Sequence, residues 1–387
     1  MNALIVGAGI GGPVAALWLQ RLGLEVSLVE ARPSPALTEG AFLGVTPNGM
    51  NAIAPLGLAE RIARRGLRCE GFQFLNSAGH RIGEIDRSQD AEHFGWPLTM
   101  IRRADLHLVL HEACNERGIA TRFGHRLLGL TQRADHITAT FADGNTLDAD
   151  ILIGCDGLRS RVRALGIPDA PQPTATGLLD FGGFARVEAL PLPQGRNVMV
   201  FGRRAFFGAF TTPMGETWWF HNGPTPIREL SPEQHRQRML ELHADDPDWI
   251  AHCIRATSQI LGPWPLHELV AMPRWSSGRL CLLGDAAHAM SPSAGQGAAM
   301  AMEDALVLTQ CLRDLPDPPR AFARFEALRR PRVDAIFRAA QRNSNNKALG
   351  PVAAWFRDRI LPRVLPAAGR AQSDSYAHRL HWEDRVV

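Results

Sequence analysis

Glycines at positions 7, 9 and 12 and the carboxylate of Glu30 are the first residues in this chain whose types and spacing could do chemistry. In a GxGxxG pattern the first glycine permits a tight turn, the second leaves room for a pyrophosphate, and the third allows close contact between helix and strand. Unpaired N–H groups at the start of the following helix favour that pyrophosphate. Glu30 can accept hydrogen bonds from both ribose hydroxyls and disfavours a 2′-phosphate. The pattern therefore predicts a site for NAD or FAD.

The elements that must position these residues are a strand, a helix and a second strand. ALIV at 3–6 reads as a short buried strand, and EVSLV at 25–29 reads as the next strand, ending on Glu30. Between them a helical pattern runs through Leu22 and stops at Gly23. A GxGxxG pattern alone is weak, because any tight turn from strand to helix favours glycine. Its place inside a βαβ unit makes the dinucleotide interpretation much stronger.

Two later stretches separate FAD from NAD. DADILIGCDGLRSRVR at 148–163 is a predicted strand that breaks at Cys155-Asp156-Gly157 and enters a short basic helix. GDAAHAMSPSAGQGAAMAMEDA at 284–305 follows the predicted strand RLCLL at 279–283. A nicotinamide dehydrogenase needs no second Gly-Asp turn so far downstream. FAD does, because its ribityl chain and isoalloxazine ring extend away from the first βαβ unit.

These three motifs, in this order, resemble those of the single-component (group A) FAD-dependent aromatic hydroxylases of the p-hydroxybenzoate hydroxylase fold. The compact salicylate-, urate- and tetracycline-oxidising members are the most similar in character. GAFLGVTPNGMNAIAPLGL at 40–58 and IRRADL at 101–106 agree as well. The resemblance covers most of the chain except about 173–274 and the C-terminal tail.

The resemblance implies particular roles around the flavin. Asp285 would accept hydrogen bonds from the ribityl hydroxyls, Pro292 would lie beside the isoalloxazine, and residues 295–297 would present backbone N–H groups to its pyrimidine edge. Arg103, rather than Arg102, would contact the ribityl-phosphate side. The implied cofactor-binding residues are Gly7, Gly9, Ile10, Gly11, Gly12, Glu30, Ala31, Arg103, Leu127, Asp156, Gly157, Gly284, Asp285, Pro292, Gly295, Gln296, Gly297 and Ala298.

Several residues in these motifs also have plain structural interpretations. Asp156 could cap the helix that follows it, and Arg163 in the same motif is similar to residues that the family uses near the nicotinamide donor. We expect His288 to be structural. Met300 and Met302 are expected to pack in the helix core. For Glu303 and Asp304, we expect one of them to be solvated or bonded to a nearby arginine.

The segment from about 173 to 274 predicts a β-sheet. NVMVF, AFFGAFTT and ETWWFHN read as strands joined by Gly and Pro turns, followed by a helix at about 231–243. The hairpin GFQFLNSAGHRIGEI at 71–85 could join the same sheet. We therefore expect an α/β fold in which a mostly antiparallel substrate domain is inserted into a Rossmann-like FAD-binding domain, followed by C-terminal helices. The expected ranges are 1–70, 101–172 and 275–335 for the FAD-binding domain, 71–100 and 173–274 for the substrate domain, and 336–387 for the helical segment.

Candidates for the substrate site come from this sheet. Trp219 and His221 share one strand face by alternation, and we expect that face to lie opposite the loop of Pro292, itself a candidate for contact with the reacting centre. His221 is also a candidate base for a phenolic substrate, and Arg204 is a third candidate for substrate binding. A core aromatic, a surface histidine and a solvated turn arginine are the respective alternatives. Tyr376 is the only tyrosine and lies elsewhere, so the tyrosine with which some relatives hold phenols or purines has no counterpart.

Composition excludes other classes of function. The 387 residues carry a formal net charge of +3 with no basic run, so no nucleic-acid partner is expected, and Lys347 is the only lysine. Six cysteines lie far apart without metal-ligand spacing, which predicts free buried thiols and no metal site. No export signal is visible, so a cytoplasmic protein is expected. An apolar helix face near 348–365 could rest on a membrane, although packing across the two domains is the expected use and no membrane is required.

The activity that the resemblance implies is a monooxygenase reaction. NAD(P)H, as NADPH or NADH, would reduce a non-covalent FAD, and a flavin hydroperoxide would deliver one oxygen atom from O₂ to a small, aromatic or polycyclic substrate. A reductase or oxidase on the same fold and a non-catalytic FAD-bound interaction protein remain alternatives, because fold and cofactor do not establish chemistry. The chain is expected to be a monomer or homodimer.

Overall fold

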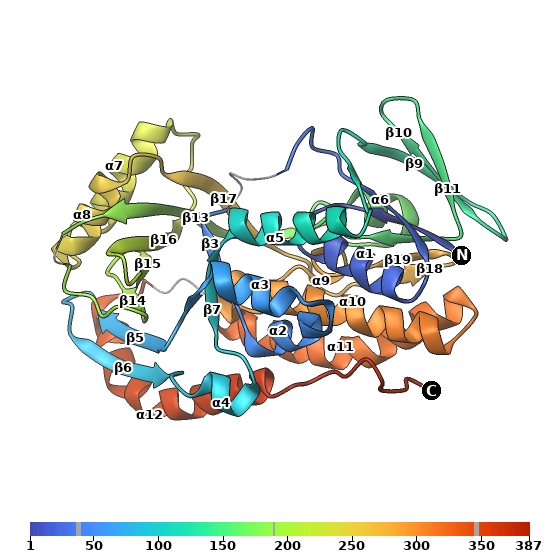
Figure 1. Cartoon of the computed structure of the whole chain (residues 1–387). Helices are drawn as coiled ribbons and strands as arrows, with labels where there is room; N and C mark the ends of the chain where they lie inside the picture. The colour runs from blue at the N-terminus through green and yellow to red at the C-terminus, as the bar shows by residue number, and fades with distance from the viewer. Residues whose placement is uncertain (36–39, 189, 344–347) are drawn as a thin grey trace.

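The structure is a computed structural model, and it describes residues 1–35, 40–188, 190–343 and 348–387. Two large sheets lie at opposite ends of an elongated molecule, with helices between and beneath them (Figure 1). Both chain termini lie in the half of the molecule that contains the first strand, the N-terminus beside its sheet and the C-terminus below α10 and α11. This arrangement confirms the predicted α/β fold with one parallel and one mostly antiparallel sheet.

The first sheet has six strands, and its four central strands run parallel to each other. Its strands in spatial order are β18 (Ser276–Ser277), β19 (Leu280–Leu282), β12 (Ile151–Gly154), β1 (Asn2–Val6), β2 (Glu25–Val29) and β8 (Thr121–Arg122). The central strands are short, apolar and buried, as is typical of a parallel sheet covered on both faces. The predicted strands at 3–6, 25–29 and 279–283 are all present.

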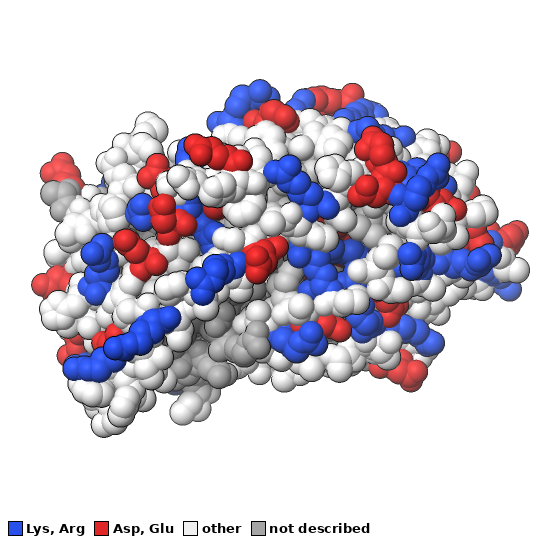
Figure 2. All heavy atoms as spheres, turned by 90° about the horizontal axis from the view of Figure 1, so that it is seen from below, with Lys and Arg blue, Asp and Glu red and all other residues white. Residues whose placement is uncertain are grey.

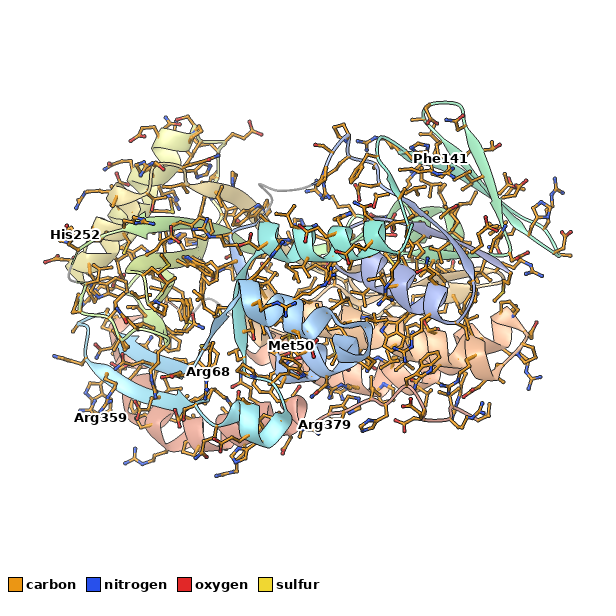
Figure 3. The ribbon with its side chains drawn as sticks, viewed as in Figure 1. Met50, Arg68, Phe141, His252, Arg359 and Arg379 are labelled. Atoms are coloured by element: carbon orange, nitrogen blue, oxygen red, sulfur yellow. The ribbon has the colours of Figure 1, made fainter. Side chains whose placement is uncertain are left out.

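Helices cover this sheet and form the main hydrophobic core with it. They are α1 (Gly11–Arg21), α5 (Arg103–Glu116), α6 (Arg161–Gly166), α9 (Asp285–His288), α10 (Gly297–Asp314) and α11 (Pro318–Asn343). Buried residues of α10 include Met300 and Met302, which confirms that these methionines pack in the core. Two further helices, α2 (Pro47–Ile53) and α3 (Leu58–Arg65), lie beside α10 and α5, with Met50 of α2 fully buried near the middle of the molecule (Figure 3).

The second large sheet has seven strands and includes the predicted hairpin. Its strands in spatial order are β17 (Leu261–Glu268), β13 (Thr174–Arg186), β16 (Glu216–Pro224), β15 (Phe206–Thr211), β14 (Asn197–Phe201), β5 (Gly71–Asn76) and β6 (Arg81–Asp86). All neighbouring pairs are antiparallel except β14 and β5. Helices α7 (Pro232–Leu242) and α8 (Asp248–Ala256) cover one face.

Smaller elements connect the two halves. A three-stranded sheet of β3 (Phe42–Val45), β7 (Thr99–Arg102) and β4 (Leu67–Arg68) lies between the large sheets. A second one, of β11 (Thr146–Ala149), β10 (Ile137–Phe141) and β9 (Leu127–Gln132), extends beyond α6. The remaining helices are α4 (Asp90–Phe94), α12 (Pro351–Tyr376) and the 3₁₀ turns η1 (Ala54–Leu56) and η2 (Pro292–Ala294).

Other expectations from composition can be compared with the surface and the cysteines. Charged side chains of both signs are interspersed over the underside of the molecule (Figure 2). All six cysteines are free thiols, and five of them are buried. In the ranges that the structure describes, no helix combines the length and the apolarity needed to cross a bilayer.

Candidate functional site

The parallel strands bring the three sequence motifs to one edge of the six-stranded sheet. β19, β12, β1 and β2 are adjacent and run in the same direction, so their carboxyl ends lie side by side. The turns that follow them contain Asp285, Asp156, the loop of residues 7–12 and Glu30, respectively. In open α/β sheets, ligands bind outside the carboxyl ends of the strands. This edge is therefore the candidate cofactor site.

The glycines of the first loop differ in what surrounds them. A Cβ on Gly7 would lie 2.5 Å from the carbonyl oxygen of Cys155, and one on Gly12 would collide with the carbonyl oxygen of Gly7. A Cβ on Gly9 would meet no described atom within 4 Å. Gly7 and Gly12 are thus needed by the protein's own packing, whereas Gly9 leaves open space above the loop.

Glu30 holds the same loop in place. Its side chain is 8% exposed, and Oε2 accepts a hydrogen bond from the backbone N–H of Ala8 at 2.8 Å. Oε1 accepts one from the backbone N–H of Arg32 at 3.0 Å. A carboxylate has further lone pairs for ribose hydroxyls. Glu30 is therefore also a structural residue, a role that its position at a strand end did not predict.

The Gly284-Asp285 turn approaches α10 closely. Gly284 has φ of +60° and ψ of −138°, a conformation that is almost restricted to glycine, and a Cβ there would lie 3.1 Å from the Cβ of Ala301. Asp285 is exposed, and its carboxylate forms no hydrogen bond or ion pair with any residue the structure describes. It lies near Gly297, because a Cβ added to that glycine would be 4.0 Å from Asp285 Oδ1. The Asp285 carboxylate is thus available to a ligand.

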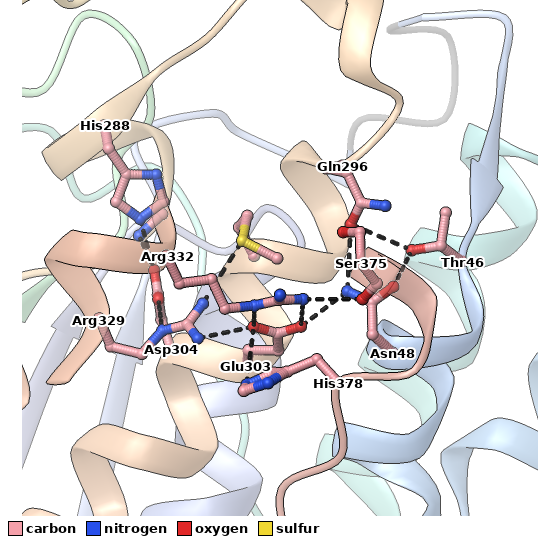
Figure 4. Close-up of polar contacts among 12 residues, drawn as sticks. Thr46, Asn48, His288, Gln296, Glu303, Asp304, Arg329, Arg332, Ser375 and His378 are labelled. Carbon is pink, nitrogen blue, oxygen red and sulfur yellow. Dashed lines mark hydrogen bonds and ion pairs between the residues drawn. The ribbon is translucent and has the colours of Figure 1, made fainter. Parts of the chain in front are cut away.

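A buried charged cluster fixes this turn to α10 and α11 (Figure 4). Asp304 Oδ2 accepts hydrogen bonds from the Gly284 N–H at 3.1 Å and from His288 Nε2 at 2.6 Å, and Oδ1 accepts one from Arg329 Nε at 2.7 Å. Burial alone would raise the pKa of Asp304, but the charges of His288 and Arg329 lower it to about 2. His288 is thus a structural residue, as expected.

The neighbouring Glu303 completes the cluster. It is 1% exposed and accepts hydrogen bonds from Arg329, from both ends of the Arg332 guanidinium and from Asn48 Nδ2. The same Asn48 amide donates to Gln296 Oε1 at 3.1 Å (Figure 4). Of the two alternatives for these acids, solvation or a bond to a nearby arginine, the structure shows the bond to arginine, and it does so for both acids. The cluster holds the residues just before α10 in position.

In the middle motif, Asp156 caps a helix. Its carboxylate accepts hydrogen bonds from Ser160 Oγ and from the backbone N–H groups of Arg161 and Val162 at the start of α6. Burial raises the pKa of Asp156, and these donors oppose that effect. Arg163 is buried and donates to the carbonyls of Ala286 and Leu158, which ties α6 to the Gly-Asp turn. The contacts therefore support the capping alternative for Asp156.

The two arginines at the start of α5 are in different environments. Arg102 donates to Glu216 at 2.5 Å and lies 4.1 Å from the ring centroid of Phe184, so it is bound to the seven-stranded sheet. Arg103 is exposed, and its side chain lies next to Gly40.

Leu127 begins β9 with its side chain in the main core, so only its backbone could face a cofactor. Ala31 lies exposed directly after Glu30.

A hollow of about 370 Å³ is lined by residues of α6 and of the segments just before and after it. Arg159, Arg161, Gln172 and His267 are among its lining residues. Arg159 and Arg161 are exposed, and no acidic side chain lines the hollow. Arg163 also lines the hollow and donates to the carbonyl of Ala286, just after the Gly-Asp turn, so the hollow lies near that turn. The positive charge of its arginines suits a phosphate-bearing ligand.

The structure corrects the expectation for Trp219 and His221. The two residues share a strand face, but that face packs against α7 and α8 rather than toward the FAD-binding half. Trp219 Nε1 donates to Thr257 Oγ1 at 2.8 Å just after α8, and its ring stacks on Phe207. Alternation predicted the shared face correctly. It could not determine which of the two faces the helices cover.

His221 forms part of a buried chain of polar groups. Its Nδ1 lies 2.9 Å from His243 Nε2, and His243 Nδ1 donates to Asp246 Oδ2 at 2.7 Å. Burial, followed by the charge of His243, lowers the pKa of His221 well below its ordinary range. Arg204 is also misplaced as a substrate candidate, because it is exposed and pairs with Asp245 at 2.8 Å near the same helices. None of these residues lies on the inner face of the sheet.

The inner face, toward β3, is formed by the alternate residues of the same strands. Phe220 and Trp218 of β16 have ring centroids 6.3 and 5.7 Å from that of Phe42 in β3. By strand pairing, the inner face also includes Asp180, Phe206, Asn222 and Trp264. Asn222 Nδ2 donates to Asp180 Oδ1 at 2.6 Å. For Trp218, Phe220 and Asn222 the sequence signal was their position in ETWWFHN, where they alternate with Trp219 and His221 and so face the other side of the sheet.

Comparison with known proteins was made on the sequence and on the fold. Residues 1–340 match the family model described as FAD binding domain. Aurachin C monooxygenase/isomerase of Stigmatella aurantiaca is 30% identical over 369 residues, 93% of this chain and 94% of that protein. 3-Hydroxybenzoate 6-hydroxylase of Klebsiella oxytoca is 31% identical over 352 residues, 87% and 86% of the two chains. The structure of Klebsiella pneumoniae HpxO complexed with FAD and uric acid superposes with a TM-score of 0.88, at 24% identity and coverages of 97% and 96%.

Proposed function

Because the chain belongs to the FAD-dependent monooxygenase family, we propose that it uses NAD(P)H and O₂ to insert one oxygen atom into a small, planar aromatic or heteroaromatic substrate. One observation carries the proposal. The phosphate loop, the Gly-Asp turn and the start of α10 meet at the carboxyl edge of one sheet, between that sheet and an inner face rich in aromatic side chains.

The residues at this edge fit FAD. Cβ atoms on Gly9 and Gly295 would meet no described atom within 4 Å, so both glycines leave open space on the ligand side. Asp285 offers an exposed carboxylate near Gly297, and Glu30 offers lone pairs to a ribose. FAD, once reduced by NAD(P)H, supplies the activation of O₂ and the transfer of one oxygen atom.

The protein's own contribution at the flavin would be electrostatic and positional. The N-terminus of α10 carries unpaired N–H groups and a partial positive charge, which favour negative charge on a nearby ring. Gln296 is 4% exposed and is held by Asn48, so the backbone at this helix start is fixed before any ligand binds. A preorganised site of this kind stabilises developing charge without reorganising during the reaction.

The substrate would lie against the inner face of the seven-stranded sheet. Phe42, Phe206 and Phe220 provide flat apolar surface there, and the Asp180–Asn222 pair provides polar groups that orient a bound ring. The relatives' names point the same way, since they specify 3-hydroxybenzoate, 6-hydroxynicotinate and urate as substrates of those proteins. The basic hollow beside α6 would receive the phosphate groups of NAD(P)H.

The experiment is a substrate screen with a stoichiometric readout. The purified holoprotein is supplied with NADH or NADPH and a panel of phenols and N-heteroaromatics, while NAD(P)H oxidation and hydrogen peroxide release are measured together. We expect at least one compound that accelerates NAD(P)H oxidation and lowers the peroxide yield, with one labelled atom from ¹⁸O₂ in the product. NAD(P)H oxidation that always ends in peroxide, or a reduced product without labelled oxygen, would contradict the proposal.

A further inference from the structure

Helix α12 carries a stripe of large apolar side chains that are exposed to solvent. Val352, Trp355, Phe356, Ile360 and Val364 are between 46% and 71% exposed. They recur at spacings of one, three and four residues, so they lie along one side of the helix. The opposite side packs on the seven-stranded sheet, where Leu365 is buried against Gly83 of β6. One side of α12 is therefore unpartnered.

Elsewhere in the described parts of the chain, exposed large apolar side chains are more scattered. Met214 and Ile227, for example, lie in separate turns of the seven-stranded sheet region. Isolated exposed apolar residues are normal on a protein surface, whereas a contiguous row indicates an interaction site. The row of apolar side chains on α12 therefore indicates a surface that binds a partner.

Arginines lie among these apolar side chains, three or four residues from Trp355, Phe356 and Ile360, and their charges have one sign. Arg359, Arg363 and Arg370 are exposed on α12, and none of them pairs with an acidic side chain among the described residues. The one acid between Val352 and Arg370, Asp358, is engaged by Arg357 and Asn76. The guanidinium of Arg359 stacks 3.5 Å from the ring centroid of the exposed Trp355. Figure 2 shows this underside, on which α12 lies.

We propose that α12 binds the surface of an anionic lipid membrane, with its apolar stripe in the headgroup region and its arginines against the lipid phosphates. Interfacial helices combine Trp, Phe and other apolar side chains with many Lys and Arg residues. On α12 both kinds of side chain lie on the exposed side of the helix. The apolar side chains supply burial, and each arginine adds attraction to an anionic surface. Since no described helix is suited to cross a bilayer, the attachment is peripheral and reversible.

The charges favour a membrane over a second copy of the chain. A symmetric contact through the stripe would bring Arg359 and Arg363 close to their own counterparts, with no free acid on this face to balance them. An anionic membrane balances the same charges. The inference does not depend on the proposed substrate, because α12 packs on β6, away from the flavin edge of the other sheet.

The test uses the FAD-loaded full-length protein in a vesicle flotation assay. Vesicles of phosphatidylcholine alone are compared with vesicles containing equal parts of phosphatidylcholine and phosphatidylglycerol, at low and high salt. We expect binding to the anionic vesicles that weakens with salt, and little binding to phosphatidylcholine. The double variant Phe356→Ser, Ile360→Ser should reduce binding roughly tenfold or more, because two apolar side chains no longer leave water. Arg359→Glu with Arg363→Glu should abolish it.

Two controls keep the result interpretable. Ile227→Ser, a change at an even more exposed apolar residue away from α12, should leave vesicle binding unchanged. FAD content and NAD(P)H oxidation without vesicles should be unaffected by the α12 variants, which shows that they are folded. Absence of binding to anionic vesicles, or binding that survives both double variants, overturns the proposal. A dimer in solution that the Phe356→Ser, Ile360→Ser variant dissociates would assign the stripe to a second copy instead.

Discussion

Asp304 and His288 form a buried hydrogen bond of 2.6 Å between α10 and the end of α9. The same carboxylate oxygen accepts from the backbone of Gly284, and the other oxygen accepts from Arg329. The bond therefore connects the turn that carries Asp285 to two long helices. It makes the position of the Gly284-Asp285 turn dependent on a fully buried residue of α10.

Replacement of Asp304 by asparagine should destabilise the protein strongly. The variant leaves the buried Arg329 with reduced charge compensation, and losing one partner of a buried ion pair costs about 3–5 kcal/mol. Urea denaturation of the two proteins measures this loss. Glu116→Gln, which breaks a solvent-exposed pair with Arg61, should change stability little. Equal losses in the two variants would show that the buried pair has no special role.

The pKa of Asp304 also gives this contribution a pH dependence. Its folded-state pKa is about 2, below the ordinary 3.8, so the folded form holds its negative charge more strongly than the unfolded form. The stabilisation is complete above about pH 4 and is lost as the pH falls toward 2. In Asp304→Asn this part of the acid dependence should disappear.

His107 should lower the free energy of unfolding as the pH falls, in a range above the one in which Asp304 acts. It is 2% exposed, its Nδ1 has no hydrogen-bond partner among the described residues, and burial, together with Arg103 and His111, lowers its pKa from 6.5 to about 4. The folded form therefore binds fewer protons, and stability should fall by roughly 2–4 kcal/mol between pH 6.5 and 4. Denaturation at several pH values should show a flatter profile for His107→Leu. His252→Leu, at an exposed position, should keep the wild-type slope.

Glu30→Ala should weaken FAD binding. It removes an acceptor for ribose hydroxyls and releases the Ala8 N–H that fixes the phosphate loop, and a hydrogen bond to a charged group contributes about 1.5–3 kcal/mol. FAD affinity, measured by fluorescence titration of the apoprotein, should fall by one to two orders of magnitude at that estimate. Glu30→Gln keeps an oxygen for Ala8 and should lose less. Unchanged affinity in both variants would limit Glu30 to a structural role.

Gly295→Ala should affect FAD more than folding. Gly295 has a φ of +62°, and a Cβ added there would meet no described atom within 4 Å; Gly118 has a φ of +74° and equally open surroundings far from the site. Alanine at either position should cost about 1–2 kcal/mol of stability from the left-handed backbone alone. Only Gly295→Ala should lose FAD affinity, by roughly tenfold or more, and slow flavin reduction. Equal FAD affinity in the two variants would place the flavin elsewhere.

Phe220 and His221 are adjacent in β16 but face opposite sides of the sheet. Phe220→Ala should raise the KM for the substrate and the peroxide yield, because it removes a flat apolar surface from the inner face. His221→Ala should leave KM unchanged and cost about 1–3 kcal/mol of stability, because His243 loses its buried partner. The opposite pattern would return His221 to the substrate site.

The sequence determined the cofactor half of this protein almost completely. Short apolar strands, glycines at fixed offsets and an acid at a strand end are local features, and they predicted β1, α1, β2 and the Gly-Asp turn near their observed positions. The contact that requires Gly12, with the carbonyl of Gly7, lies inside one βαβ unit, whereas Gly7 and Gly284 are confined by Cys155 and Ala301 of distant segments. The family and FAD followed from the same residues.

Only the tertiary structure decided the substrate half and the roles of the charged residues. Alternation placed Trp219 and His221 on one face, but the position of α7 and α8, far along the chain, determined that this face is the outer one. For Glu303 and Asp304 the sequence left solvation and pairing with an arginine as alternatives, and α11 decided between them by bringing Arg329 and Arg332 against these acids. A side chain's environment depends on which distant element covers it. The sequence of one segment does not indicate which distant element will cover its side chains.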